Sequence, residues 1–335
     1  MIREAIDKIV RKINLNQDET SQVFEEIMNG EATPVQIGAF ITALRMKGET
    51  VDEITAAARM MRKKASIISL GEQEDIIDTC GTGGDLSNTF NISTAAALVV
   101  AGCGIKVAKH GNRSVSSQCG SADVLEELGV KIDLPPERVK ECIKKIGIGF
   151  MFAPVFHGAM KFAAGPRKEI GIRTIFNILG PLSNPAKATH QVMGVFKAEL
   201  TETLAKVLLN LGARGAMIAH SEEGLDEISI SGKTKITQLK GKKIRSYYVQ
   251  PKNFGLKRAD LYSVKGGTKK ENAKIILEIL NGARGPGRDI VLMNAAAALL
   301  VMEEARDFRD GVKIAEESID SGRALEKLEL LKKEK

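Results

Sequence analysis

The chain has 335 residues, more than one typical hydrophobic core accommodates, so we expect two unequal domains. Its 43% hydrophobic and 27% charged residues describe an ordinary globular protein, and no apolar run is long enough to span a membrane. The net charge of +7 is compatible with phosphorylated ligands or nucleic acid, but with no Trp and three Tyr the chain has few platforms for base stacking. We therefore expect neither a membrane nor a nucleic-acid partner.

The chain opens without an apolar signal segment. None of its cysteines forms a CxxC pair, which argues against a zinc site and is typical of thiols in a reducing compartment. These features predict a cytoplasmic protein. The four cysteines are Cys80, Cys103, Cys119 and Cys142.

The first seventy residues predict a small all-helical domain. A second helix is expected over residues 19–28 and a third from Pro34, because proline suits the first helical position. Thr50 and Glu53 form a capping box at the start of a fourth. The first helix is predicted by apolar residues at helical spacing, namely Ile2, Ile6, Ile9, Val10 and Ile13.

From Ile76 onward, apolar strand-like runs alternate with helical patterns, which favours a mainly parallel sheet with crossover helices. Polar and apolar residues alternate over 236–248, which predicts an antiparallel extension of the sheet. The fold class is α/β, with a small all-helical N-terminal domain and a larger domain whose central sheet is flanked by helices. Strands are expected at 76–77, 105–108, 130–134, 148–152, 190–195 and 216–219, and helices at 122–128, 136–146, 199–211 and 289–302.

The first candidate site is the stretch Asp78-Thr-Cys-Gly-Thr-Gly-Gly-Asp85, which follows the first of these strands. Its glycines leave room for a ligand beside the backbone. Asn91, Ser93 and Thr94 then open an apolar helix, where Ser and Thr are good N-cap residues. A strand, a glycine loop and a helix N-terminus together bind phosphate, although the loop matches neither a Walker loop nor a dinucleotide fingerprint. Alone, such a loop could also be a packing turn.

The second candidate site is Lys109-His-Gly-Asn-Arg-Ser-Val-Ser-Ser117, followed by Gly120-Ser-Ala-Asp123. It follows a predicted strand, and ligands bind at the carboxyl ends of strands in open α/β sheets. Lys109 and Arg113 bring positive charge, and the neighbouring amide and hydroxyl groups bring neutral hydrogen-bonding atoms. This combination suits a diphosphate or a sugar phosphate.

Two further segments carry weaker signals. Asp226 and Glu227 follow another predicted strand, and paired carboxylates suit Mg²⁺, although adjacent acids are also common on surfaces. Arg167 and Arg173 lie in the stretch 164–174, where an arginine can hold a carboxylate ligand or form a structural ion pair. Spacing does not choose between these alternatives.

With these motifs in this order, the chain resembles the anthranilate phosphoribosyltransferase family over essentially its whole length. The resemblance is carried by GTGGD, KHGNRSVSS with GSADVLE, GPRKEIGIRTIFNILGPLSNP and GLDE. It implies transfer of the phosphoribosyl group from phosphoribosyl pyrophosphate (PRPP) to the amino group of anthranilate, giving N-(5-phosphoribosyl)anthranilate and pyrophosphate in tryptophan biosynthesis. Gln118, Cys119 and Gly158 depart from the usual pattern without removing a functional position.

The resemblance also implies roles for individual residues. Ser93, Asp226 and Glu227 match ligands of Mg²⁺. Gly81, Asn112 and Arg167 match the anthranilate contacts, with His110 and His157 close to that path, and Lys109 and His110 are the catalytic candidates. The positions that match PRPP-binding residues are Gly81, Gly84, Asp85, Thr89, Asn91, Ile92, Ser93, Thr94, Lys109, His110, Gly111, Asn112, Arg113, Ser114, Val115, Ser116, Ser117 and Ser121.

At the level of domains, the resemblance implies a helical domain over residues 1–70, joined in space by about 165–190, and a PRPP-binding α/β domain over 71–335. It further implies a homodimer formed through the helical domain. Glycines beside an acid at residues 83–85 suggest a loop that becomes ordered on the donor and a hinge between the domains.

The chemistry expected at such a site is mainly electrostatic. Pyrophosphate leaves as an anion, and Mg²⁺ with Lys109 can offset the charge that develops on it. The amine of anthranilate is neutral at pH 7, so no strong general base is needed. His110 either accepts a proton late or only shapes its loop. His190 and His220 are expected to be structural.

Two other functions remain compatible with parts of this pattern. A pyrimidine nucleoside phosphorylase shares the architecture, although the acid pair and KHGNR argue against it, and phosphorolysis of thymidine or uridine would decide. A non-enzymatic nucleic-acid-binding relative would use the basic charge, and salt-sensitive DNA binding would reveal it.

Overall fold

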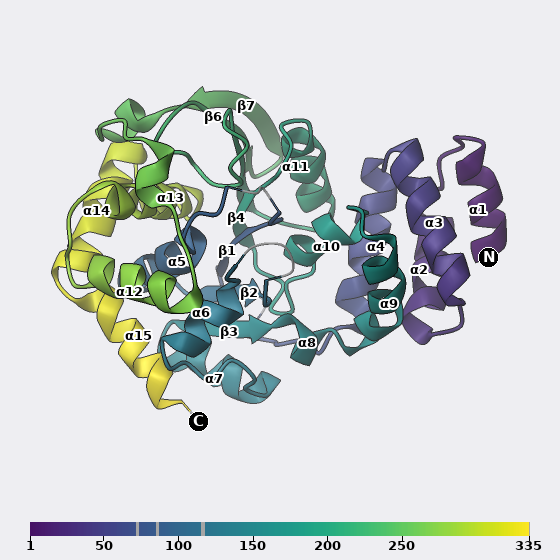
Figure 1. Cartoon of the computed structure of the whole chain (residues 1–335), viewed down its shortest axis with the longest axis horizontal. Helices are drawn as coiled ribbons and strands as arrows, with labels where there is room; N and C mark the ends of the chain where they lie inside the picture. Colours follow the sequence, from purple (N-terminus) through teal and green to yellow (C-terminus); the bar gives the residue numbers. More distant parts are fainter. Residues whose placement is uncertain (72–73, 85–86, 115–117, 335) are drawn as a thin grey trace.

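The computed structural model describes residues 1–71, 74–84, 87–114 and 118–334. A helical bundle lies at one end of the molecule and a sheet covered by helices at the other (Figure 1). The predicted fold class is confirmed. Within the part that the structure describes, no helix is long and apolar enough to cross a bilayer.

In the N-terminal bundle, capping boxes fix the starts of three helices. Asn16, Thr33 and Thr50 each accept the N–H group three residues ahead, and the side chain at that position accepts the cap's own N–H. The first helix ends at Val10, and Val10 and Ile13 are 65% and 46% exposed, so the predicted apolar face of this helix is narrower than expected. The helices are α1 (Ile2–Val10), α2 (Gln17–Asn29), α3 (Pro34–Lys47) and α4 (Val51–Lys64).

The seven strands form one sheet in the order β3-β2-β1-β4-β5-β6-β7. Neighbours from β3 to β5 are parallel, and β6 and β7 add the predicted antiparallel extension. The chain leaves β1 on one side for β2 and β3 and later returns on the other side as β4, so the strand order reverses between β1 and β4. The strands are β1 (Ile77–Gly81), β2 (Val107–Gly111), β3 (Ile148–Phe152), β4 (His190–Gly194), β5 (Gly215–Ser221), β6 (Thr234–Lys240) and β7 (Lys243–Val249).

Apolar side chains cover both faces of the parallel strands, as expected for a sheet buried between helices. Val192 and Met217 belong to the core that α5 and α13 share, whereas Met193 and Ile218 belong to the core of α11 and the helical bundle. The helices of the α/β part are α5 (Ile92–Gly102), α6 (Ser121–Glu127), α7 (Pro136–Lys145), α11 (Leu200–Asn210), α12 (Lys269–Leu280), α13 (Pro286–Val301), α14 (Phe308–Asp320) and α15 (Arg323–Lys333).

Between β3 and β4 the chain leaves the sheet and packs against the bundle. Ala163, Phe176 and Leu179 are buried in the same core as the N-terminal helices. This segment contains α8 (Ala153–Phe156), the 3₁₀ turn η1 (Gly158–Met160), α9 (Lys161–Ile170) and α10 (Phe176–Leu182), and two further 3₁₀ turns are η2 (Pro251–Phe254) and η3 (Leu261–Val264).

Three local predictions were wrong. β1 and β2 run on to Gly81 and Gly111, so Asp78–Gly81 and Lys109–Gly111 are strand residues rather than loop residues. The expected strand over 130–134 is absent from the described chain. Val130, Ile132 and Leu134 are buried in alternation there, but the segment pairs with no strand, because the alternation reflects burial against the core and not hydrogen bonding.

Candidate functional site

The glycine loop lies where the strand order reverses. Gly81 and Gly194 are partners in register at the ends of β1 and β4, and the Thr82 N–H donates to the Gly194 carbonyl at 2.9 Å. A Cβ on Gly194 would collide with the backbone carbonyl of Asp226, and a Cβ on Gly81 would collide with its carboxylate. These two glycines therefore let the acidic segment lie across the ends of both strands, where ligands bind in open α/β sheets.

The acid pair faces the glycine loop and the start of α5. Asp226 Oδ2 accepts the Gly83 N–H at 2.8 Å, and Glu227 Oε1 accepts the Ser93 N–H at 3.2 Å. The backbone groups that suit a phosphate thus lie beside two carboxylates, and a cation is needed before a polyanion can bind among them. No group of three His, Cys, Asp or Glu side chains suited to a metal occurs among the described residues.

The start of α5 differs from the prediction. Its N-cap residue is Asn91, which makes no side-chain capping bond, and Ser93 and Thr94 lie inside the first turn. The predicted Ser or Thr cap was wrong because the helix already begins at Ile92, and the Asn91 amide makes no capping bond because it binds Cys119 and Asn272 instead. Within this first turn, the Ser93 N–H donates to Glu227 and the Ile92 and Thr94 N–H groups donate to the Phe90 and Asn91 carbonyls, so the start of α5 is tied to the acid pair and to the preceding loop.

A buried charged pair lies beneath the loop. Lys109 is 3% exposed, and its Nζ donates to the Thr79 carbonyl at 2.6 Å. Asp78 accepts the His110 N–H at 3.2 Å and the Asn184 side-chain amide at 2.8 Å. Burial raises the pKa of Asp78 to about 6 against the opposing effect of Lys109, and burial lowers the pKa of Lys109. Asp78 had no predicted role of its own, although an acid next to a buried apolar strand is a signal for one.

Two histidines meet on the side of the bundle. The rings of His110 and His157 have centroids 5.0 Å apart, and both residues are buried. Burial lowers their pKa values to about 3 and about 4. His110 Nδ1 lies 3.2 Å from the Gly180 carbonyl, while the buried Nε2 atoms of both rings have no hydrogen-bonding partner among the residues that the structure describes. A pKa this low makes His110 a weak proton acceptor, which favours the second role left open for it, namely to shape its loop.

Two arginines of the segment after η1 approach the same region. The Arg167 guanidinium lies 5.1 Å from the centre of the Phe176 ring, and burial alone lowers its pKa. Arg173 lies 4.4 Å above Phe196, and its Nη2 would be 3.0 Å from a Cβ on Gly84. Because no acidic residue in the described part of the chain contributes to the pKa of Arg167, this cation is suited to a carboxylate ligand.

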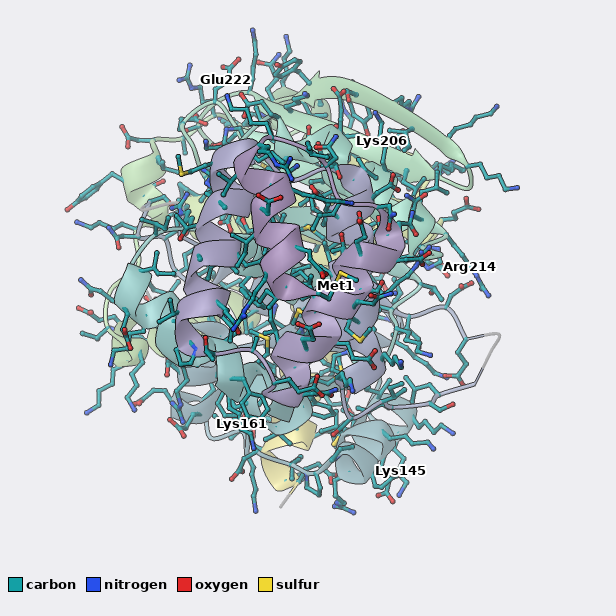
Figure 2. All side chains as sticks on the ribbon, turned by 90° about the vertical axis from the view of Figure 1, so that its right-hand side faces the viewer. Met1, Lys145, Lys161, Lys206, Arg214 and Glu222 are labelled. Atoms are coloured by element: carbon teal, nitrogen blue, oxygen red, sulfur yellow. The ribbon has the colours of Figure 1, made fainter. Side chains whose placement is uncertain are left out.

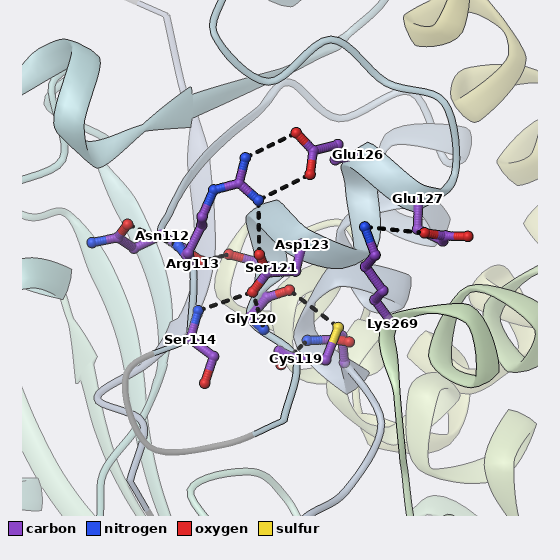
Figure 3. Close-up of polar contacts among 11 residues, drawn as sticks. Asn112, Arg113, Ser114, Cys119, Gly120, Ser121, Asp123, Glu126, Glu127 and Lys269 are labelled. Carbon is purple, nitrogen blue, oxygen red and sulfur yellow. Dashed lines mark hydrogen bonds and ion pairs between the residues drawn. The ribbon is translucent and has the colours of Figure 1, made fainter.

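The loop after β2 is organised by its own ion pairs (Figure 3). Arg113 binds Asp123 at 2.9 Å and Glu126 at 2.8 Å, so its charge is directed to α6. Asp123 also accepts the N–H groups of Ser114 at 3.0 Å and Gly120 at 2.9 Å. The Arg113 guanidinium therefore ties the loop to α6, and its positive charge is shared between two carboxylates.

Comparison with known proteins identifies the family. The helical-bundle domain of a glycosyl transferase family matches residues 3–65, and the α/β domain of the same family matches residues 73–325. The anthranilate phosphoribosyltransferase of Acetivibrio thermocellus is 56% identical over 329 residues, covering 98% of this chain and 95% of that protein.

The chain belongs to the anthranilate phosphoribosyltransferases. The family and the enzyme class expected from the sequence are thereby confirmed, and with them the transfer of a phosphoribosyl group to anthranilate.

Solved anthranilate phosphoribosyltransferases share the fold. The crystal structure of the enzyme from Thermus thermophilus has a TM-score of 0.92 at 41% identity, with 98% of each chain covered. The enzyme from Saccharomyces cerevisiae in complex with PRPP and Mg has a TM-score of 0.89 at 29% identity, covering 98% of this chain and 96% of that chain. The yeast enzyme has also been solved with 4-fluoroanthranilate.

The predicted site residues of this chain come from several strand ends. Gly81, Ser93, Lys109 and His110 lie around the ends of β1 and β2, while Thr89 pairs with Lys265 farther along the loop. Ile92 is fully buried, so only its backbone is available to a ligand. Four of the residues predicted to bind PRPP lie outside the residues that the structure describes: Asp85, Val115, Ser116 and Ser117.

The remaining histidines have structural contacts. His190 Nδ1 lies 3.0 Å from the Thr189 hydroxyl, and His220 Nδ1 lies 2.7 Å from the Val195 carbonyl.

Ser121 and Asn112 lie close to the end of β2. A Cβ on Gly111 would collide with the Ser121 hydroxyl, which donates to the Asn112 carbonyl at 3.4 Å. Asn112 Oδ1 accepts the Arg113 N–H at 2.8 Å.

Proposed function

We propose that PRPP binds between the glycine loop and the loop after β2, with Asp226, Glu227 and the Ser93 hydroxyl as the protein ligands of Mg²⁺. The observation that carries this proposal is the position of both carboxylates against the N–H groups of Gly83 and Ser93. Oxygen ligands of this kind suit Mg²⁺, which usually takes one or two carboxylates and completes its shell with water and substrate oxygens. When bound, the ion offsets negative charge on the pyrophosphate group.

Anthranilate is proposed to bind on the side of the bundle, with its carboxylate on Arg167 and its ring near His110 and His157. Among the residues that the structure describes, no acid contributes to the pKa of Arg167, which supports the first contact, and neither Nε2 atom has a partner, which supports the second. Gly81 at the end of β1 and Asn112 directly after β2 are proposed to complete this site.

The protein's part in the reaction is to hold charges and orient reactants. The C–N bond forms between the amino nitrogen of anthranilate and the anomeric carbon of the donor while the bond to pyrophosphate breaks. Lys109, fixed by the Thr79 carbonyl, supplies positive charge near the acid pair. The amine is neutral before attack, so positioning accounts for most of the expected rate, and the low pKa of His110 agrees with the absence of a strong base.

We propose that the helical domain comprises residues 1–70 together with about 165–190, and that residues 71–335 otherwise form the PRPP-binding domain. The shared core of the bundle with Ala163, Phe176 and Leu179 supports this division.

A homodimer is proposed to form through the bundle, whose end faces the viewer in Figure 2. Val35 and Met46 of α3, each 81% exposed, are apolar groups available to a second copy. The proposed location is the cytoplasm.

Loss of anthranilate fluorescence in the presence of PRPP and Mg²⁺ tests the reaction, and Arg167→Ala tests the acceptor site. We expect loss that requires both donor and metal, and a rise in KM for anthranilate of about 10- to 100-fold in the variant, because a charge-assisted pair is removed. Arg245→Ala is the matched control, since Arg245 also lies over an aromatic ring, that of Tyr247, on the edge strand β7.

No fluorescence loss from folded protein with intact donor would overturn the assignment. Phosphorolysis of thymidine or uridine under the same conditions would then indicate a nucleoside phosphorylase.

A further inference from the structure

A side chain of α12 links the two segments that we assign to the phosphoribosyl donor. Asn272 lies in the first turn of α12 and is 2% exposed. Its Oδ1 accepts the Gly267 N–H at 2.8 Å, and its Nδ2 donates to Asn91 Oδ1 at 3.0 Å. Both ends of one buried amide are therefore used, one on its own loop and one on the residue that opens α5.

Asn91 extends this connection to the second segment. Its Nδ2 donates to the Cys119 carbonyl at 3.1 Å, just before Gly120 and Ser121 open α6. The hydrogen bonds thus run from Gly267 through Asn272 and Asn91 to Cys119. They join three segments that are distant in sequence, and α12 packs against both α5 and α6 (Figure 1).

The backbone around this connection is closely packed. The Phe90 N–H donates to the Val264 carbonyl at 3.2 Å, and the Gly266 N–H donates to the Asn88 carbonyl at 2.8 Å. A Cβ on Gly266 would lie 2.7 Å from the Phe90 nitrogen and 2.8 Å from Asn272 Oδ1. The segment before α12 therefore fixes the loop that precedes α5, with Asn272 at the point of contact.

Only an amide satisfies both partners of Asn272. An aspartate would place an oxygen against Asn91 Oδ1, where a donor is needed, and an apolar residue would leave buried polar groups without partners. Asn272 itself is buried while Asn91 and Gly267 are half-buried, so we expect loss of these hydrogen bonds to loosen the contact between the neighbouring segments.

We propose that Asn272 is a positioning residue for the phosphoribosyl donor: it orients Asn91 and thereby sets the position of the loop after β1 relative to the loop after β2. This inference rests on the proposed assignment of both loops to the donor. The residues proposed to bind anthranilate are Arg167, His110 and His157, and their contacts given above do not involve Asn272 or Asn91. We therefore expect changes at Asn272 to affect binding of the donor and not of anthranilate.

The test compares Asn272→Ala and Asn272→Asp with Asn281→Ala, a control at the exposed end of the same helix. We expect both Asn272 variants to raise KM for PRPP about tenfold, the effect of one buried hydrogen bond. KM for anthranilate should stay within about twofold, and the control should match the unaltered enzyme in both constants. Equal rises in the two KM values, or no change in either, would overturn the proposal.

A double variant separates positioning from a general loss of stability. If Asn272 acts through Asn91, then Asn91→Ala with Asn272→Ala raises KM for PRPP no further than Asn91→Ala alone, whereas multiplied effects contradict the proposal. Amide exchange without substrates gives an independent readout: the Phe90 and Ala122 amides should exchange faster in Asn272→Ala, and unchanged exchange would count against it. Inactivity of the unaltered protein would instead overturn the proposed function, and the exchange result would still decide whether Asn272 holds the two loops.

Discussion

The buried rings of His110 and His157 lie with their centroids 5.0 Å apart, and neither Nε2 atom has a hydrogen-bonding partner among the described residues. Burial holds both imidazoles neutral at physiological pH, because their pKa values fall to about 3 and about 4. The pair therefore presents neutral polar atoms to the proposed acceptor side of the site.

This neutrality predicts a specific acid sensitivity. In the unfolded chain His157 binds a proton below about pH 6.5, but in the folded chain it does so only near pH 4. The contribution of the neutral, buried His157 to the free energy of unfolding is therefore complete above pH 6.5 and is lost as the pH falls towards 4. The loss amounts to about 3 kcal/mol at most. We expect His157→Gln to flatten the decline in the free energy of unfolding between pH 6.5 and 4.5, measured by urea denaturation. Parallel pH curves for the two proteins would contradict this account.

Asp78 and Lys109 are expected to depend on each other. Removing either charge leaves the other buried without its neighbour, so Asp78→Asn and Lys109→Met should each lower the free energy of unfolding by about 3 kcal/mol. The double variant should lose clearly less than the sum, because no uncompensated charge remains. Urea denaturation of the three variants at pH 8, above the pKa of about 6 for Asp78, measures this coupling. Additive losses would show that the two side chains do not interact.

The acid pair is expected to govern the metal requirement. Asp226→Asn removes one carboxylate from beside the glycine loop, and we expect a reduction in kcat/KM for PRPP of about 100-fold, partly restored by higher Mg²⁺. Glu222→Gln is the matched control, because Glu222 is an exposed acid of the same loop and is labelled at the molecular surface in Figure 2. A control that loses as much activity as Asp226→Asn would point to the charge of the loop as a whole rather than to metal binding.

The proposed dimer makes a prediction about the bundle surface. A lysine in place of Met46 puts a charge where an apolar contact is expected, so Met46→Lys should shift sedimentation towards the monomer by raising the dimer dissociation constant at least about tenfold. Tyr262→Lys changes a side chain that is 76% exposed on the α/β part and should leave the distribution unchanged. A monomeric unaltered protein at micromolar concentration would rule out a stable dimer.

Local sequence patterns determined the elements and their order. The capping boxes at Thr33 and Thr50, and the glycine run after Ile77, depend on residues a few positions apart, so they can be read from the chain itself. The same holds for the strand ends at which the candidate residues lie, since a strand followed by a helix places its carboxyl end at the ligand-binding edge of the sheet. The boundaries at Gly81 and Gly111, the strand expected over 130–134 and the cap of α5 were wrong.

The tertiary structure alone decided which of these residues meet and in which charge state. Asp226 reaches Gly81 because β4 pairs with β1, and Arg113 is bound by Asp123 and Glu126 because α6 folds back on its loop. The neutrality of His110 follows from desolvation by segments distant in the chain. Pairing across long sequence separations and the loss of water leave no periodicity in the sequence, so the sequence named the parts of the site while packing fixed their contacts and charges.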